Sequence, residues 1–151
     1  MTTDQRFASA AAWVLILWGV GHIVVIDILP LAFGLYLYDV DPASLEQMRQ
    51  TVLRFPFMGE TTMYFAFYGL SVWLGASLTF FGILNLIVAR SDQERVSRRV
   101  VYVFDIALAV VFLAIAAICF FVIPVLGATL ALLLFSLALA TSAGTRTEPR
   151  G

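Results

Sequence analysis

A few polar side chains interrupt the long apolar runs of this 151-residue sequence. The stretch GHIVVIDILP, residues 21–30, contains the only histidine, His22, together with Asp27 and Pro30. Imidazole can exchange a proton near neutral pH, and a carboxylate beside it can bind or orient it. On an α-helix, residues five apart point about 140° away from each other. We therefore expect His22 and Asp27 to occupy different faces, with the helix loosening before Pro30 and Asp27 at the outer interface.

A second apolar run offers neighbours for His22. From Glu60 to Asn85, polar or small residues recur at alternating steps of four and three, which aligns them along one side of a helix. In lipid, such a side faces other helices. Counting inward from the outer end of both runs places His22 level with Tyr68, so we predict a hydrogen bond to Tyr68 or Tyr64. The candidate ligand-binding residues are His22, Asp27, Glu60, Tyr64 and Tyr68.

Several kinds of chemistry remain open for this cluster. His22 can simply hold two helices together, or it can act as acid or base with Tyr68 or Glu60 on a lipophilic substrate. A metal site would need both carboxylates to approach His22, and we expect none. Proton or ion passage lacks a carboxylate at mid-membrane. No phosphate-binding loop, paired histidines, serine nucleophile elbow or second cysteine beside Cys119 is present in the sequence, so the sequence assigns no cofactor.

A second polar pair is expected nearer the arginine-rich side. Asn85 lies five residues before Arg90, and Asp105 lies six residues after Arg99, so both have similar shallow depth. We predict that Asn85 and Asp105 form a structural hydrogen bond between helices, with a proton relay as the alternative.

The composition determines which elements carry these residues. Hydrophobic residues make up 62% of the chain and charged residues 13%, which is typical of a membrane protein. The net charge of −1 argues against nucleic acid as a partner. We predict an all-α polytopic membrane protein: a single domain, 1–151, folded as an antiparallel four-helix transmembrane bundle. The expected spans are about 7–29, 61–89, 100–123 and 126–143.

The first connection between spans should contain its own helix. Asp41 followed by Pro42 is typical of a helix start. Apolar residues then recur at three-to-four-residue spacing, and Pro56 should end the pattern. We predict a short external amphipathic helix with the apolar positions Leu45, Met48, Val52 and Phe55.

The distribution of arginine predicts the orientation. The first connection has only Arg49 and Arg54, and the other seven of the nine arginines lie in the termini or the second connection. Because cationic residues concentrate on the cytoplasmic side, both termini are expected in the cytoplasm. The seven are Arg6, Arg90, Arg95, Arg98, Arg99, Arg146 and Arg150.

Two segments resemble a known group of proteins. The stretches MRQTVLRFP, 48–56, and FYGLSVWLGASLTFFGILNL, 67–86, are similar to small bacterial four-span inner-membrane proteins with no assigned activity. The resemblance implies an architecture and a bacterial inner membrane, and it implies no chemistry.

The expected function is therefore binding or accessory. We predict a pocket for a lipid- or quinone-like molecule in the outer half of the bundle, or docking on a larger membrane complex. A small membrane enzyme using His22 is the alternative, and a small dimeric transporter is the third. The expected partners are membrane lipid, a lipophilic small molecule, and a larger membrane complex or a second copy of the chain.

Overall fold

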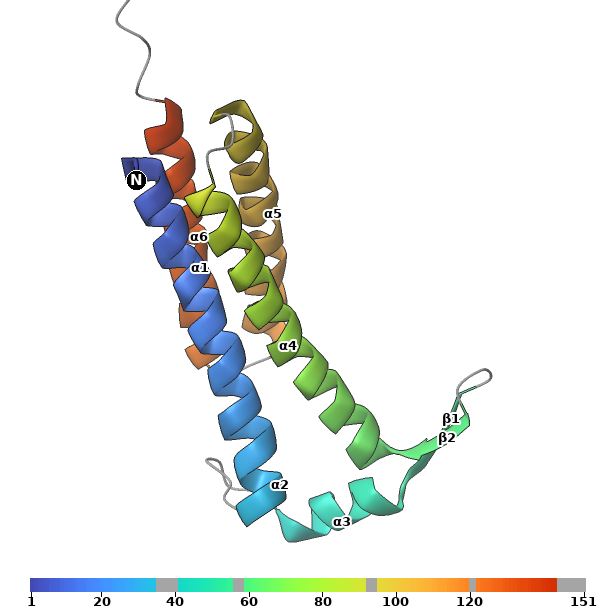
Figure 1. The fold of residues 1–151 in the computed structure, drawn as a ribbon. Helices are drawn as coiled ribbons and strands as arrows, with labels where there is room; N and C mark the ends of the chain where they lie inside the picture. The colour runs from blue at the N-terminus through green and yellow to red at the C-terminus, as the bar shows by residue number, and fades with distance from the viewer. Residues whose placement is uncertain (35–40, 56–58, 92–94, 120–121, 144–151) are drawn as a thin grey trace, which may run out of the picture. The chain divides into compact units, whose positions relative to one another are not determined.

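The computed structural model describes residues 1–34, 41–55, 59–91, 95–119 and 122–143. Pro56, Arg146 and Arg150 lie outside these ranges. In chain order the elements are α1 (Thr3–His22), the π-helix η1 (Ile23–Ile28), α2 (Leu29–Phe33), α3 (Pro42–Gln50), the strands β1 (Val52–Phe55) and β2 (Gly59–Thr62), α4 (Met63–Arg90), α5 (Arg95–Cys119) and α6 (Val122–Ala143) (Figure 1).

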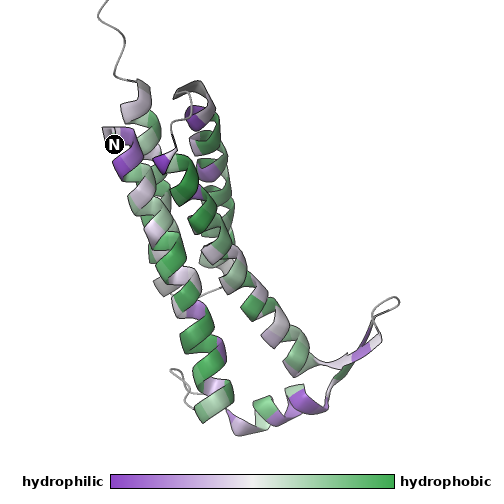
Figure 2. Ribbon diagram, in the orientation of Figure 1, coloured by the Kyte–Doolittle hydropathy of each residue, from purple (hydrophilic) through white to green (hydrophobic). Residues whose placement is uncertain are grey.

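Four helical segments are long and apolar enough to cross a membrane. They are Thr3–Phe33, Met63–Arg90, Ser97–Ala117 and Pro124–Ser142, and Figure 2 shows the hydrophobic residues along them. Large apolar side chains on these helices point outward, among them Trp73 and Phe104, whereas many of the buried residues are alanines. This arrangement suits lipid around the helices, because small residues let helices approach and lipid solvates the large ones. The predicted membrane fold of four helices is confirmed.

The chain separates into two compact units. The four-helix unit comprises Met1–Leu17 and Thr79–Gly151, and the two-helix unit comprises Trp18–Leu78.

The core of the four-helix unit takes small residues from every long helix. One buried cluster contains Ala8 of α1, Ala89 of α4, Tyr102 of α5 and Ala138 of α6. Gly82 shows how closely α1 and α4 approach here, because an added Cβ would lie 2.8 Å from the carbonyl oxygen of Ala12. The chain changes direction from each long helix to the next in sequence, so the start of α1 lies beside the end of α4.

In the two-helix unit, the first span contains a wide turn where the sequence predicted a loosened end. From Ile23 to Ile28 the backbone is π-helical, and the Leu29 N–H donates to the carbonyl of Val24, five residues earlier. Pro30 follows directly and lacks an N–H, which removes one donor from the α-helical pattern. The helix nevertheless continues to Phe33, so the predicted end at Leu29 was wrong. Gly34 ends it with a φ of 64°, in the left-handed region that glycine adopts readily.

The external helix is present, and it is shorter than predicted. The Asp41 carboxylate caps α3 by accepting from the backbone N–H groups of Ala43 at 3.2 Å and Ser44 at 3.1 Å. The helix ends at Gln50, and Val52 and Phe55 belong instead to β1. This strand pairs antiparallel with β2, a hairpin that the period of the apolar residues did not indicate.

Candidate functional site

The histidine joins two helices of the two-helix unit. His22 Nε2 lies 2.9 Å from Ser71 Oγ on α4, within hydrogen-bonding distance. The prediction that His22 bonds a side chain of the second span is confirmed, and the predicted partners, Tyr68 and Tyr64, were wrong. Because the first span extends to Phe33 instead of Leu29, its outer end lies about one turn farther from His22, and the level on α4 moves from Tyr68 to Ser71.

Two glycines allow this contact. Gly75 lies one turn beyond Ser71, and a Cβ added to it would lie 3.0 Å from the carbonyl oxygen of Gly19 and 2.6 Å from Cγ1 of Ile23. The backbones of α1 and α4 are therefore close enough for the short serine side chain to reach the imidazole.

The π-helix changes the position of Asp27. Its hydrogen bonds join residues five apart, so its turn is wider than that of an α-helix, and the angle between His22 and Asp27 is smaller than the predicted angle of about 140°. The prediction that the two residues occupy different faces assumed an ordinary α-helical turn throughout.

Asp27 is also buried, whereas the sequence analysis predicted it at the outer interface. Its exposed fraction is 1%, and Oδ2 has no hydrogen-bond partner among the residues that the structure describes. A buried polar atom normally has a partner, because leaving it unpaired costs about 1–3 kcal/mol. Asp27 therefore offers an acceptor that the described protein atoms leave unused.

The remaining predicted site residues lie apart from His22. Glu60 is exposed on the hairpin and forms an ion pair with Arg54 at 2.9 Å. The Tyr64 ring lies 5.2 Å from the Arg49 guanidinium and stacks on Tyr68 with 6.4 Å between ring centroids. The tyrosines thus connect α3 to the start of α4.

The second polar pair is hydrogen-bonded, inside the four-helix unit. The Asn85 side-chain amide donates to Asp105 Oδ1 at 3.0 Å and to the carbonyl of Phe81 at 3.1 Å. Both Asn85 and Asp105 are buried. Asp105 Oδ2 has no partner within the described ranges. The bond joins α4 to α5, as the structural interpretation of this pair requires.

A third polar group was not predicted from the sequence. Asp4, at the start of α1, is buried and lies 3.5 Å from Arg98 Nε, and the hydroxyl of Tyr102 donates to the same carboxylate oxygen at 3.5 Å. Thr2 donates to the other oxygen. An acidic residue near the arginine-rich end was the available signal, but the sequence alone did not show that Arg98 turns inward.

The groups at this site can exchange protons and form hydrogen bonds. Within the described part of the chain, no three His, Cys, Asp or Glu side chains come together as a metal site. His22 can donate or accept a proton, Ser71 holds one of its nitrogens, and Asp27 supplies a nearby acceptor.

Comparisons with known proteins do not assign this chain to a family. No family model, curated protein or solved structure matches this chain. Functional inference therefore comes from the geometry of the His22 cluster.

Proposed function

We propose that this protein binds a lipophilic molecule whose head group donates a hydrogen bond, such as a quinol or a hydroxyl-bearing lipid. The observation that carries this proposal is the buried Oδ2 of Asp27, which has no hydrogen-bond partner among the described residues. A ligand hydroxyl supplies the missing donor at this atom. Asp27 lies in a segment apolar enough to cross a membrane, so the proposed ligand is one that dissolves in lipid.

His22 supplies a second contact for the same head group. The His22 Nε2 atom is hydrogen-bonded to Ser71, and Nδ1 has no hydrogen bond to any described residue. One imidazole nitrogen and one carboxylate oxygen, contributed by a single π-helical turn, together bind a head group that has both a donor and an acceptor. Quinols and partial glycerides have such head groups.

We place this binding site in a bacterial inner membrane, with both chain termini in the cytoplasm. The positive-inside rule supports this orientation. In the four-helix unit, Gln5 at the start of α1 donates to the carbonyl of Ser91 at 3.5 Å, which brings the amino terminus to the same end as the arginine-rich second connection.

Thermal unfolding in mild detergent tests the binding proposal. A short-chain benzoquinol and a monoacylglycerol serve as probes, and at least one should raise the Tm of the parent protein, because a ligand that binds the folded state stabilises it. Asp27→Asn should abolish the shift. Glu46→Gln, which makes the same chemical change on an exposed residue of α3, should retain it. Absence of a shift with both probes, or an equal shift in Asp27→Asn, would overturn the proposal.

An enzyme is the second candidate, and one observation favours it. A serine hydroxyl 2.9 Å from an imidazole, with a carboxylate nearby, is the order of groups used in acyl transfer. The earlier alternative with Tyr68 and Glu60 loses support, because Glu60 pairs with Arg54 on the hairpin. A fluorophosphonate probe separates the two functions. Labelling that Ser71→Ala abolishes and Ser77→Ala retains would indicate an enzyme, and a binding protein stays unlabelled.

A further inference from the structure

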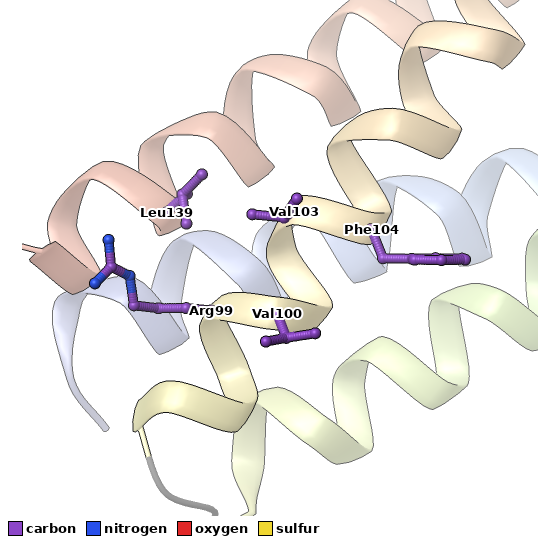
Figure 3. A pocket seen from close by; sticks show the side chains of 5 residues that line it. All are labelled: Arg99, Val100, Val103, Phe104 and Leu139. Carbon is purple, nitrogen blue, oxygen red and sulfur yellow. The ribbon is translucent and has the colours of Figure 1, made fainter.

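The four-helix unit contains a hollow between α5 and α6, away from the polar groups described above. It measures about 490 Å³ and is lined by Arg99, Val100, Val103, Phe104 and Leu139. Figure 3 shows Val103 and Leu139 on facing sides, with the Arg99 side chain extending toward the end where α5 begins. The lining is therefore apolar with one cation at its edge.

The depths of these residues along the membrane helices match the order of head group and acyl chain in a phospholipid. Arg99 is the third residue of the apolar segment Ser97–Ala117, where head groups meet the hydrocarbon region. Val103 and Phe104 lie four and five residues farther, which is about 6–8 Å deeper along a helix. Leu139 lies three residues before the end of Pro124–Ser142. A cation at head-group level above an apolar wall matches an anionic head group above an acyl chain.

The ion pairing of Arg99 differs from that of its neighbour. Arg98 points inward, 3.5 Å from Asp4. Arg99 is exposed about 100° around the helix, and no acidic side chain among the described residues forms an ion pair with it. A guanidinium binds the oxygens of a phosphate with two parallel hydrogen bonds. Phe104 is 75% exposed, so its ring is available to an acyl chain.

We propose that this hollow is a binding site for one anionic phospholipid of the leaflet at the arginine-rich end. Arg99 holds the phosphate, and Val103, Phe104 and Leu139 hold the first part of an acyl chain. The site shares no residue with the His22 and Asp27 site and differs from it in ligand chemistry. Failure of either proposal leaves the other standing.

Native mass spectrometry of the purified full chain tests this site. Phosphatidylglycerol and phosphatidylcholine with identical acyl chains are offered in the same mixed micelles. The parent should retain phosphatidylglycerol in preference. Arg99→Gln should weaken that retention about fivefold, equivalent to about 1 kcal/mol for one surface cation. Arg6→Gln removes an exposed arginine near the same end, outside the hollow, and should change little.

A second pair of variants tests the apolar wall. Phe104→Ala should weaken both lipids alike, because they share the acyl chain, whereas Val111→Ala, at an exposed position farther along α5, should weaken neither. Equal retention of the two lipids by the parent, an equal loss in Arg6→Gln, or full retention in Arg99→Gln would overturn the proposal. A dimer that separates in Arg99→Gln would overturn it as well, since a second copy would then occupy the hollow.

Discussion

The hydrogen bond between His22 and Ser71 connects two membrane helices through their side chains. His22→Gln keeps a polar group that can reach the serine, so we expect it to retain stability. His22→Leu leaves the hydroxyl without this partner and should cost about 0.5–1.5 kcal/mol, a typical range for interhelical bonds in membranes. Thermal unfolding in detergent measures the difference.

The matching control is a double-mutant cycle with Ser71→Ala. If the bond contributes to stability, His22→Leu should cost less in the Ser71→Ala background than in the parent. Additive effects of the two substitutions would show that the bond contributes nothing.

Asp4 balances the charge of Arg98 at the start of α1. Asp4→Asn removes the negative charge that lies 3.5 Å from the buried Arg98, so it should destabilise the protein by about 3 kcal/mol. Glu46→Gln, at an exposed position, should leave the Tm unchanged. A similar Tm for the two variants would show that water or another group already neutralises Arg98.

At the scale of elements, Gly82 and Gly75 set the spacing of α1 and α4. A Cβ at Gly82 would meet the Ala12 carbonyl oxygen and the Ile16 backbone nitrogen at 2.8 and 2.9 Å, and backbone atoms cannot turn aside. Gly82→Ala should therefore cost about 1–3 kcal/mol. At Gly75 the nearest backbone atom, the carbonyl oxygen of Gly19, would lie at 3.0 Å, so Gly75→Ala should cost less.

Gly69 provides the control for these substitutions. A Cβ there meets nothing within 4 Å, and alanine favours a helix over glycine by about 1 kcal/mol. Gly69→Ala should leave the Tm unchanged or raise it. If Gly82→Ala melts like Gly69→Ala, the close approach of α1 and α4 is wrong.

The helix α3 depends on pH through its cap. Hydrogen bonds from the Ser44 hydroxyl and from the backbone N–H groups of Ala43 and Ser44 lower the pKa of Asp41. A lowered pKa in the folded state means that the cap stabilises α3 above the ordinary aspartate pKa of about 4, and that this stabilisation is lost as pH falls through the folded-state value. Hydrogen exchange of the α3 amides should accelerate in Asp41→Ala at pH 7.

The same substitution should have less effect at pH 2, because the stabilisation from the charged cap falls as pH falls toward the folded-state pKa. An equal acceleration at both pH values would show that the cap acts through something other than the charged carboxylate. Glu46→Gln, in the same helix and away from its first residues, should exchange like the parent at pH 7.

At the scale of the whole molecule, the orientation in the membrane can be measured directly. With Cys119 replaced by alanine, single cysteines at Ala43 and Ser97, both exposed, report the two sides. A membrane-impermeant thiol reagent added to whole cells should label Ala43→Cys and spare Ser97→Cys, because arginine concentrates on the cytoplasmic side. Lysed cells should show both sites labelled. The reverse pattern in whole cells would invert the proposed orientation.

Hydropathy was sufficient to predict four membrane helices, because a span in lipid requires about 20 apolar residues whatever its neighbours are. It did not predict the hairpin, since Val52 and Phe55 fit a helical period and a strand equally well. The end of the first span was wrong because Pro30 lies within a longer helix instead of terminating it.

The candidate site could be predicted only in part. The polar stripe on the second span correctly predicted which side of that helix faces His22, although the partner is Ser71. The face of Asp27 was derived for an ordinary α-helix, because a sequence read with 3.6 residues per turn contains no sign of a π-helix. Local backbone geometry, which depends on packing around Pro30, was the missing information.

The wide turn of η1 holds one residue more than an α-helix would need. A deletion normally rotates everything after it by about 100°. Removing Val25 would instead convert the five-residue spacing into four, and four residues return to nearly the same face of an α-helix. Pro30→Ala must accompany the deletion, because the proline ring would otherwise meet a carbonyl in the restored ladder. A gene shortened by one codon should thus encode a protein in which the carboxylate stays on the face of the imidazole while the wide turn is gone. No single substitution can remove the turn and keep this arrangement of the two side chains.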